Sequence, residues 1–178
     1  MKIIVVIDAQ KDFCQDFESK LVVENIRAYL EQQKAAEPCF IIFTQDCHYE
    51  DAYERSVESY FYPPHCIPDT DGFEIVDELK PYAGISFRKD SFTSAELCNT
   101  IVHYVSSLEY DKVNDRVEVE ICGFLTDICV ISNALLIRSM NPTLDISVLS
   151  NLCKGSDEDS HRAALQVMKN CLIEVKEV

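Results

Sequence analysis

Four polar or reactive side chains stand at the ends of short apolar stretches of this sequence. They are Asp8, Asp46, Lys89 and Cys129. A carboxylate withdrawn from water exchanges protons with a reacting group, and a thiol is a strong nucleophile once it is ionised. If these side chains meet in one crevice, they supply a base, a cation and a nucleophile to the same site.

Cys129 stands where an apolar run ends and a helical pattern begins, within ICGFLTDICVISNALL, residues 121–136. Thr126 or Asp127 can cap this helix, which leaves Cys129 in the first turn. There the helix dipole favours the thiolate, and thiols at helix N-termini or beside a lysine titrate at about 3.5–7.5 instead of about 8.5. Free backbone N–H groups in the same turn can hold an oxyanion. The alternative is a buried cysteine that only packs.

Asp8 and Lys89 each have a structural alternative as well. Asp8 follows the apolar residues 3–7, where aspartate also serves as a turn or cap residue. Lys89 lies between Arg88 and Asp90, and a lysine flanked by other charged residues is commonly a solvated surface charge. On a strand, however, Arg88 and Lys89 point to opposite faces, so only one of them needs to enter a crevice.

A long irregular segment, TQDCHYEDAYERSVESYFYPPHC, carries candidate metal ligands. Asp46 and His48 are two residues apart and share a face of an extended chain, while His65 follows two prolines that make its approach stiff. Aspartate with two histidines suits Zn²⁺, Fe²⁺ or Mn²⁺ with open positions for water or substrate. Two alternatives are a site without metal and a closed structural zinc site. The latter would use Cys47, His48, His65 and Cys66, but alternation along the chain disfavours it.

The elements that would position these groups alternate between apolar and amphipathic segments. We predict strands over residues 3–7, 39–44, 85–88, 117–124, 144–149 and 171–175. We predict helices over residues 20–34, 74–79, 95–108, 129–140 and 157–169, the third opened by a capping box at Thr93 and Glu96. Most strands are rich in Val and Ile without strict alternation, which is typical of strands covered on both faces. The fold class is therefore an α/β three-layer sandwich with a six-stranded, mainly parallel sheet, as one domain over residues 1–178. Ligands of such sheets bind beyond the carboxyl ends of the strands, where the four side chains stand.

Composition excludes several classes of partner. The formal net charge of −15 argues against binding to nucleic acid, which needs clustered Lys and Arg. The apolar run at residues 3–7 is too short for a secretion signal or a membrane span. Nine cysteines without a C-x-x-C pair indicate a reduced, cytoplasmic protein whose thiols are mostly packing.

Five motifs in order, IVVIDAQKDF, TQDCH, PPHC, RKDSF and GFLTDICV, resemble those of the isochorismatase-like cysteine hydrolases, and within them the nicotinamidases. The resemblance covers nearly the whole chain. It implies a triad in which Asp8 is the base, Lys89 the cation and Cys129 the nucleophile. It also implies a cis peptide bond at Phe124–Leu125, with the backbone N–H groups of Leu125 and Cys129 as the oxyanion hole.

The same resemblance implies one divalent metal ion, with zinc favoured over iron or manganese. Its ligands would be Asp46, His48 and His65, with Glu58, seven residues before the last histidine, as the fourth. Phe13, Tyr62 and Phe92 stand where relatives hold the substrate ring between aromatic side chains. Two motifs depart from the family pattern: the glycine-rich turn after the first motif is missing from CQDFESKL, and the final strand-end motif reads NLCK from Asn151.

The expected activity is hydrolysis of nicotinamide to nicotinate and ammonia through a cysteine thioester, with a metal-associated water in the second step. This activity implies a role in NAD salvage, and relatives imply a homo-oligomer. Two alternatives remain open. One is a related cysteine amidase that acts on another small amide or ureido compound, and the other is a non-catalytic thiol module of the same fold.

Overall fold

The computed structural model describes residues 1–107 and 117–178, and a six-stranded sheet forms the centre of the described part. The strands are β1 (Lys2–Ile7), β2 (Cys39–Asp46), β3 (Ser86–Lys89), β4 (Glu118–Phe124), β5 (Asp145–Lys154) and β6 (Glu174–Lys176). Their order is β3-β2-β1-β4-β5-β6, and every pairing is parallel. The predicted parallel α/β sheet is confirmed.

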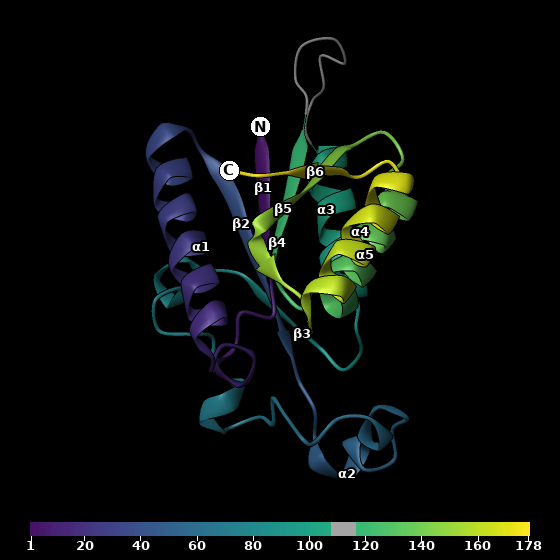
Figure 1. The fold of residues 1–178 in the computed structure, drawn as a ribbon. Helices are drawn as coiled ribbons and strands as arrows, with labels where there is room; N and C mark the ends of the chain where they lie inside the picture. The colour runs from purple at the N-terminus through teal and green to yellow at the C-terminus, as the bar shows by residue number, and fades with distance from the viewer. Residues whose placement is uncertain (108–116) are drawn as a thin grey trace.

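Helices cover both faces of this sheet (Figure 1). They are α1 (Phe17–Ala36), α2 (Glu50–Tyr53), α3 (Ala95–Ser107), α4 (Ile131–Met140) and α5 (Glu158–Asn170). Helix α1 lies on one face, whereas α3, α4 and α5 lie on the other, which makes the three layers that the sequence predicts. None of the helices in the described ranges is long and apolar enough to cross a bilayer.

The direction of the strand crossovers reverses between β1 and β4, the two central strands. Such a switch point opens a crevice at the carboxyl ends of the strands. Strand β1 is buried on both faces, with residues 3–7 fully inaccessible to solvent. Gly123 of β4 makes the close approach to β1 possible: its φ is 118°, and a Cβ there would lie 2.1 Å from the carbonyl oxygen of Ile7.

Short turns connect the longer elements, and one long segment lies at this carboxyl end. The 3-10 turns are Lys11–Phe13, Glu58–Tyr60, Asp71–Phe73 and Lys80–Tyr82, and a π-helical turn, η5, spans Thr126–Val130. Helix α2 and the irregular chain around it lie below the sheet, at the end opposite to the N- and C-termini (Figure 1). The long loop therefore faces the crevice.

Three predictions about elements are wrong. Residues 74–79 form no helix, because Ile75 pairs as an isolated bridge with Gln10, and the Val76 N–H donates to the carbonyl of Ala9. The last strand begins at Glu174 rather than at residue 171, because Cys171 ends α5 and Leu172 follows with a φ of 62°. The cap of α3 is Ser94, whose hydroxyl accepts from the Leu97 N–H, and not Thr93. The predicted end of α3 at residue 108 lies outside the described residues.

Candidate active site

Three side chains from different strand ends meet at the switch point. The Nζ atom of Lys89, at the end of β3, lies 2.7 Å from Oδ2 of Asp8 and 3.4 Å from Sγ of Cys129. It also lies 3.2 Å from Oδ1 of Asp46, at the end of β2. All four residues are at most 5% exposed. One ammonium group thus joins two carboxylates and a thiol in a site that excludes most water.

Thr44, which we did not single out in the sequence, fixes the Asp8 carboxylate. Its hydroxyl donates to Oδ1 of Asp8 over 2.7 Å and accepts from the Asp8 N–H over 3.2 Å. Asp8 itself has a φ of 46°, a left-handed conformation that turns the chain out of β1. The other carboxylate oxygen, Oδ2, is left to face Lys89.

Burial has the largest effect on the pKa values of Asp8, Cys129 and Lys89. It raises the pKa of Asp8, and the neighbouring Lys89 ammonium opposes this only in part. It also raises the pKa of the Cys129 thiol well above its ordinary value, and Asp8 raises this pKa further, whereas Lys89 lowers it. For Lys89, burial alone would lower the pKa, but the negative groups around it, Asp8 foremost, raise the pKa. The expected low pKa of the thiol is therefore wrong, because desolvation and the nearby Asp8 outweigh the effect of Lys89 on it.

The local structure around Cys129 also differs from the expected capped helix. Cys129 lies in the π-helical turn η5, which has no side-chain cap. Thr126 and Asp127 bond instead to the segment that follows β5, with Asp127 accepting from Ser156 and Thr126 sharing a hydrogen bond with His161. The peptide bond between Phe124 and Leu125 is cis, as the resemblance implies.

A second cluster next to the triad could hold a metal ion. Asp46, His48, Glu58 and His65 each offer one ligand atom, and these atoms all lie within 4.8 Å of one another. Nε2 of His48 lies 3.1 Å from Oδ2 of Asp46 and 3.8 Å from Oε2 of Glu58. Nε2 of His65 lies 3.4 Å from Oδ2 of Asp46 and 3.6 Å from Oε1 of Glu58. Ligands of a tetrahedral ion with bonds of about 2.0–2.1 Å are about 3.3 Å apart, so the four residues fit such a group.

Hydrogen bonds outside the cluster orient two of its members. Nδ1 of His65 lies 2.9 Å from the carbonyl oxygen of Pro63. Because a carbonyl only accepts, Nδ1 carries a proton, and in the neutral imidazole the lone pair of Nε2 is then available to a metal ion. Gln10, another residue that we did not single out, fixes the backbone of Asp46: its amide accepts from the Asp46 N–H over 2.7 Å and donates to the Asp46 carbonyl over 2.9 Å.

The charges within the cluster are coupled. Burial would raise the pKa of Asp46, but the two histidines and Lys89 outweigh it and hold the pKa well below its usual value. Burial would lower the pKa of His65, yet the carboxylate of Asp46 and the carbonyl of Pro63 raise it. The alternative zinc site is not formed, because Cys47 and Cys66 lie with Phe73 in a separate small apolar cluster.

A cavity of about 210 Å³ opens over both clusters. Its lining includes Cys129 and Leu125 together with Asp46, Glu58 and His65. The expected aromatic residues Phe13, Tyr62 and Phe92 also line the cavity, as do Pro63, the first of the two prolines before His65, and Asp12 and Ile128, which we did not single out. Asp12 was within reach of sequence reasoning, because it is the second acidic residue of the first motif, IDAQKDF. The thiol and three of the four candidate metal ligands thus line one cavity, whose other walls are largely apolar and partly aromatic.

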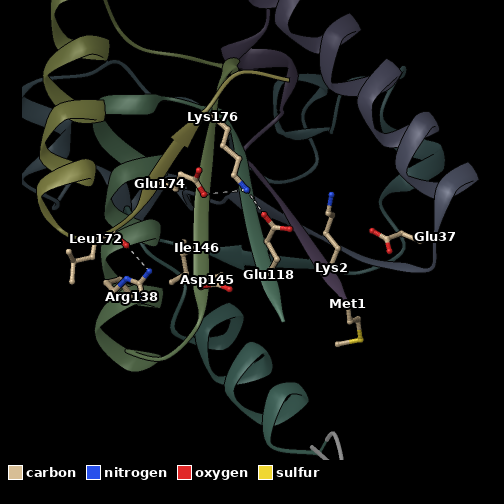
Figure 2. Close-up of a pocket in the computed structure, with 10 residues that line it drawn as sticks. All are labelled: Met1, Lys2, Glu37, Glu118, Arg138, Asp145, Ile146, Leu172, Glu174 and Lys176. Carbon is tan, nitrogen blue, oxygen red and sulfur yellow. Dashed lines mark hydrogen bonds and ion pairs between the residues drawn. The ribbon is translucent and has the colours of Figure 1, made fainter. Parts of the chain in front are cut away.

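A larger cavity, of about 450 Å³, lies at the amino ends of the strands. Figure 2 shows its charged residues, with Lys176 between Glu174 and Glu118 and with Arg138 directed at a backbone carbonyl. Lys176 and Arg138 thus already pair with carboxylates or a carbonyl of the same chain. None of the described residues that line it is a Cys, Ser or His, so the larger cavity offers no nucleophile for the chemistry considered above.

Comparisons with known proteins place these features in context. Residues 2–178 match the family model described as the isochorismatase domain. The chain is 26% identical to a nicotinamidase/pyrazinamidase of Mycobacterium tuberculosis over 192 aligned positions, which cover 98% of each chain. The fold is similar to that of a Pyrococcus horikoshii pyrazinamidase in complex with zinc (TM-score 0.81, 22% identity, 99% of each chain). It is also similar to that of PnC1 from L. infantum in complex with nicotinate (TM-score 0.76, 19% identity, 99% and 92%).

Proposed function

This chain belongs to the isochorismatase family, and from that premise we propose that it is a nicotinamidase, which hydrolyses nicotinamide to nicotinate and ammonia. The observation that carries the proposal is the contact of Lys89 with both Asp8 and Cys129, because Cys129 also lines a cavity with aromatic walls. The full-length similarity to a curated nicotinamidase/pyrazinamidase supports the choice of an amide substrate.

The first half of the reaction needs a base, because burial raises the pKa of the Cys129 thiol well above its ordinary value. Asp8 accepts the proton of Cys129 as the sulfur attacks the carboxamide carbon, and its raised pKa suits this exchange. The carbonyl oxygen becomes an oxyanion, which the backbone N–H groups of Leu125 and Cys129 hold. Asp8 then returns the proton to the departing nitrogen, ammonia leaves, and a thioester of Cys129 with nicotinate remains.

The second half reverses these roles. Asp8 removes a proton from a water molecule, whose oxygen attacks the thioester carbon. The carbon–sulfur bond breaks, nicotinate forms, and Asp8 returns the proton to the sulfur. Throughout, the Lys89 ammonium remains charged and stabilises whichever of its neighbours is negative.

Asp46, His48, Glu58 and His65 would hold one divalent cation, zinc by the donor set, with iron or manganese as alternatives. When bound, such an ion polarises water or the pyridine nitrogen of the substrate and lowers the pKa of that water. Phe13, Tyr62 and Phe92 would enclose the single aromatic ring of the substrate, because they surround the same cavity as the thiol.

The proposal extends to the setting of the reaction. All nine cysteines are unpaired, which supports a reducing compartment such as the cytoplasm. The similarity to a nicotinamidase/pyrazinamidase supports a place in the salvage of NAD, and we propose that the protein assembles into a homo-oligomer. Light scattering on the purified protein tests the assembly directly.

The test is ammonia release from nicotinamide by the reduced, zinc-loaded protein and by the Cys129→Ala variant. We expect turnover by the wild type and its loss in the variant, with the far-UV spectrum unchanged. Cys98→Ala, at a buried cysteine of α3 outside the site, is the matched control and keeps activity. Near-normal ammonia release by Cys129→Ala contradicts the mechanism. Activity on another amide or a ureido compound alone contradicts the substrate, and no hydrolysis of any amide indicates a non-catalytic thiol module.

A further inference from the structure

The turn that carries Cys129 is tied to a segment about thirty residues further along the chain. Oδ1 of Asp127 accepts the Ser156 N–H over 2.8 Å, and Oδ2 accepts the Ser156 hydroxyl over 2.5 Å. Ser156 lies in the connection between β5 and α5. Because both oxygens of the Asp127 carboxylate accept from the same residue, the two bonds fix the position and the orientation of Ser156 relative to the turn that carries Cys129.

A second tie lies one residue earlier in the turn. The hydroxyl of Thr126, which is fully buried, lies 2.8 Å from Nδ1 of His161 in α5. Gly155 lies between the two ties: a Cβ there would approach both Oδ1 of Asp127 and Cβ of His161 to 2.9 Å. The contact is therefore close enough that only glycine fits at this point.

These ties lie beside the reacting groups but outside the cavity. Thr126 and Asp127 stand between Leu125 and Cys129, whose N–H groups we assign to the oxyanion. None of Thr126, Asp127, Ser156 and His161 lines the cavity, so they do not touch the substrate. The turn has no side-chain cap of its own, and these contacts with a distant segment replace it. A shift of about 1 Å in a reacting atom costs about a hundredfold in rate, so the anchoring of this turn matters to catalysis.

We propose that Asp127 and His161 are positioning residues, which hold the η5 turn against the β5–α5 connection and thereby keep the sulfur and the two N–H groups in reacting geometry. The proposal rests on the proposed function for its turnover readout. It predicts that losing the ties lowers kcat and leaves KM nearly unchanged, because substrate contacts are intact.

The experiment compares Asp127→Ala, Asp127→Asn and a control on the zinc-loaded protein. Asp127→Ala loses both bonds to Ser156, and we expect kcat to fall by about a hundredfold with KM within about threefold. Asp127→Asn keeps an acceptor for the Ser156 N–H and should recover part of the loss. The matched control is Asp159→Ala, which removes another carboxylate of the same region, one that pairs with Arg162 in α5. It should remain within about twofold of the wild type.

A double-mutant cycle tests the second tie. Thr126→Val and His161→Ala each remove one partner of the same bond, so the double variant should lose no more kcat than the worse single variant. Additive losses mean that His161 acts elsewhere and overturn its assignment. An Asp127→Ala variant with a lowered melting temperature but kcat within about twofold shows a merely structural contact and overturns the proposal.

A turnover-independent readout separates this proposal from the proposed function. Alkylation of Cys129 by iodoacetamide forms a carbon–sulfur bond, releases iodide and requires loss of the thiol proton. Asp8 takes up the thiol proton and Lys89 stabilises the thiolate, so a sulfur displaced from both should be alkylated at least about fivefold more slowly in Asp127→Ala than in the wild type and the control. Equal or faster alkylation overturns the positioning role. Absence of ammonia release by the wild type, with slower alkylation in the variant, overturns the nicotinamidase proposal alone.

Discussion

At the scale of single residues, the positive charge of Lys89 stabilises the three acidic groups of the site. Its ammonium lies within 3.4 Å of Asp8, Asp46 and Cys129, and each of these groups is buried. Two carboxylates this close repel each other when both are ionised, and the ammonium offsets that repulsion. Its neighbour Arg88 points the other way and stacks on Phe73, 4.9 Å from the ring centroid. The alternation of a strand thus sends one cation into the site and one to the surface.

Replacing Lys89 with Met should abolish ammonia release and destabilise the protein. An uncompensated buried charge costs about 3–5 kcal/mol, and we expect the lower end because Asp8 can take up a proton. Urea unfolding of the metal-free variant measures the loss. Arg88→Met is the matched control, with an expected change below about 1 kcal/mol, since its side chain is exposed. Equal stability of the two variants would refute this account of Lys89.

Gln10 acts on the metal-ligand cluster through the backbone of Asp46. Removing it in Gln10→Ala leaves the Asp46 N–H and carbonyl without their side-chain partner. Outer residues of this kind typically contribute 10–100-fold to metal affinity, so we expect zinc affinity to fall by about that factor. Competition with a chromophoric chelator measures it. Gln45→Ala is the control, because Gln45 donates to the carbonyl of Phe73, as Gln10 does, but not to Asp46.

At the scale of elements, the ends of helices and strands decide what the site can do. Strand β1 ends in a left-handed Asp8, β4 ends at a cis peptide bond, and α1 starts next to the crevice with Asp16 as its cap. Asp16 accepts from the Ser19 N–H over 2.9 Å and pairs over 3.0 Å with Lys154, at the end of β5. A single capping residue therefore also joins α1 to the strand beyond the switch point.

Asp16→Ala should lower the free energy of unfolding by about 1 kcal/mol, the usual loss for a helix cap. The Ser19 N–H and then Lys154 lower the pKa of Asp16 to about 2. Because the folded-state pKa lies below the unfolded value, this contribution is present above about pH 4 and disappears as the pH falls toward 2. Urea unfolding at neutral pH and at about pH 2 measures both values. A difference between wild type and variant that persists at the lower pH contradicts the assignment.

At the scale of the whole molecule, one loop joins the metal-ligand cluster, the cavity and the sheet. The segment between β2 and β3 contributes His48, Glu58 and His65 to the cluster, and Tyr62 to the cavity. Its inner support is Tyr53, which is buried and donates to the carbonyls of Tyr62 and Pro63. A metal ion there would connect this loop to Asp46 at the end of β2.

Chelation should therefore lower thermal stability as well as activity. Free zinc at a hundred times its dissociation constant stabilises the folded state by about 2.7 kcal/mol, which corresponds to roughly 5–10 °C in melting temperature for a chain of this size. Calorimetry with zinc and with a chelator measures the shift. The His65→Ala variant should show little or no shift, and a full shift in that variant would place the metal elsewhere.

The sequence by itself determined the local elements and the residues worth examining. Runs of Val and Ile predicted the parallel sheet, because a strand covered on both faces must be apolar throughout. The order of motifs pointed to Asp8, Lys89 and Cys129, and the spacing of Asp46, His48 and His65 to a ligand set, to which the resemblance to the nicotinamidases added Glu58. These are properties of neighbouring residues or of a linear pattern, so they can be read without coordinates.

The tertiary structure alone decided how these groups interact. The pKa of Cys129 rises because packing removes water from the sulfur, an effect that no spacing reveals. The supports at Thr44, Gln10 and Ser156 are bonds between distant segments. The wrong prediction of a helix over residues 74–79 has the same cause, because the pairing of Ile75 with the distant Gln10 overrode a helical pattern in the sequence. Local propensity amounts to tenths of a kcal/mol per residue, whereas burial and long-range hydrogen bonds each contribute about 1 kcal/mol or more, so tertiary contacts prevail where the two conflict.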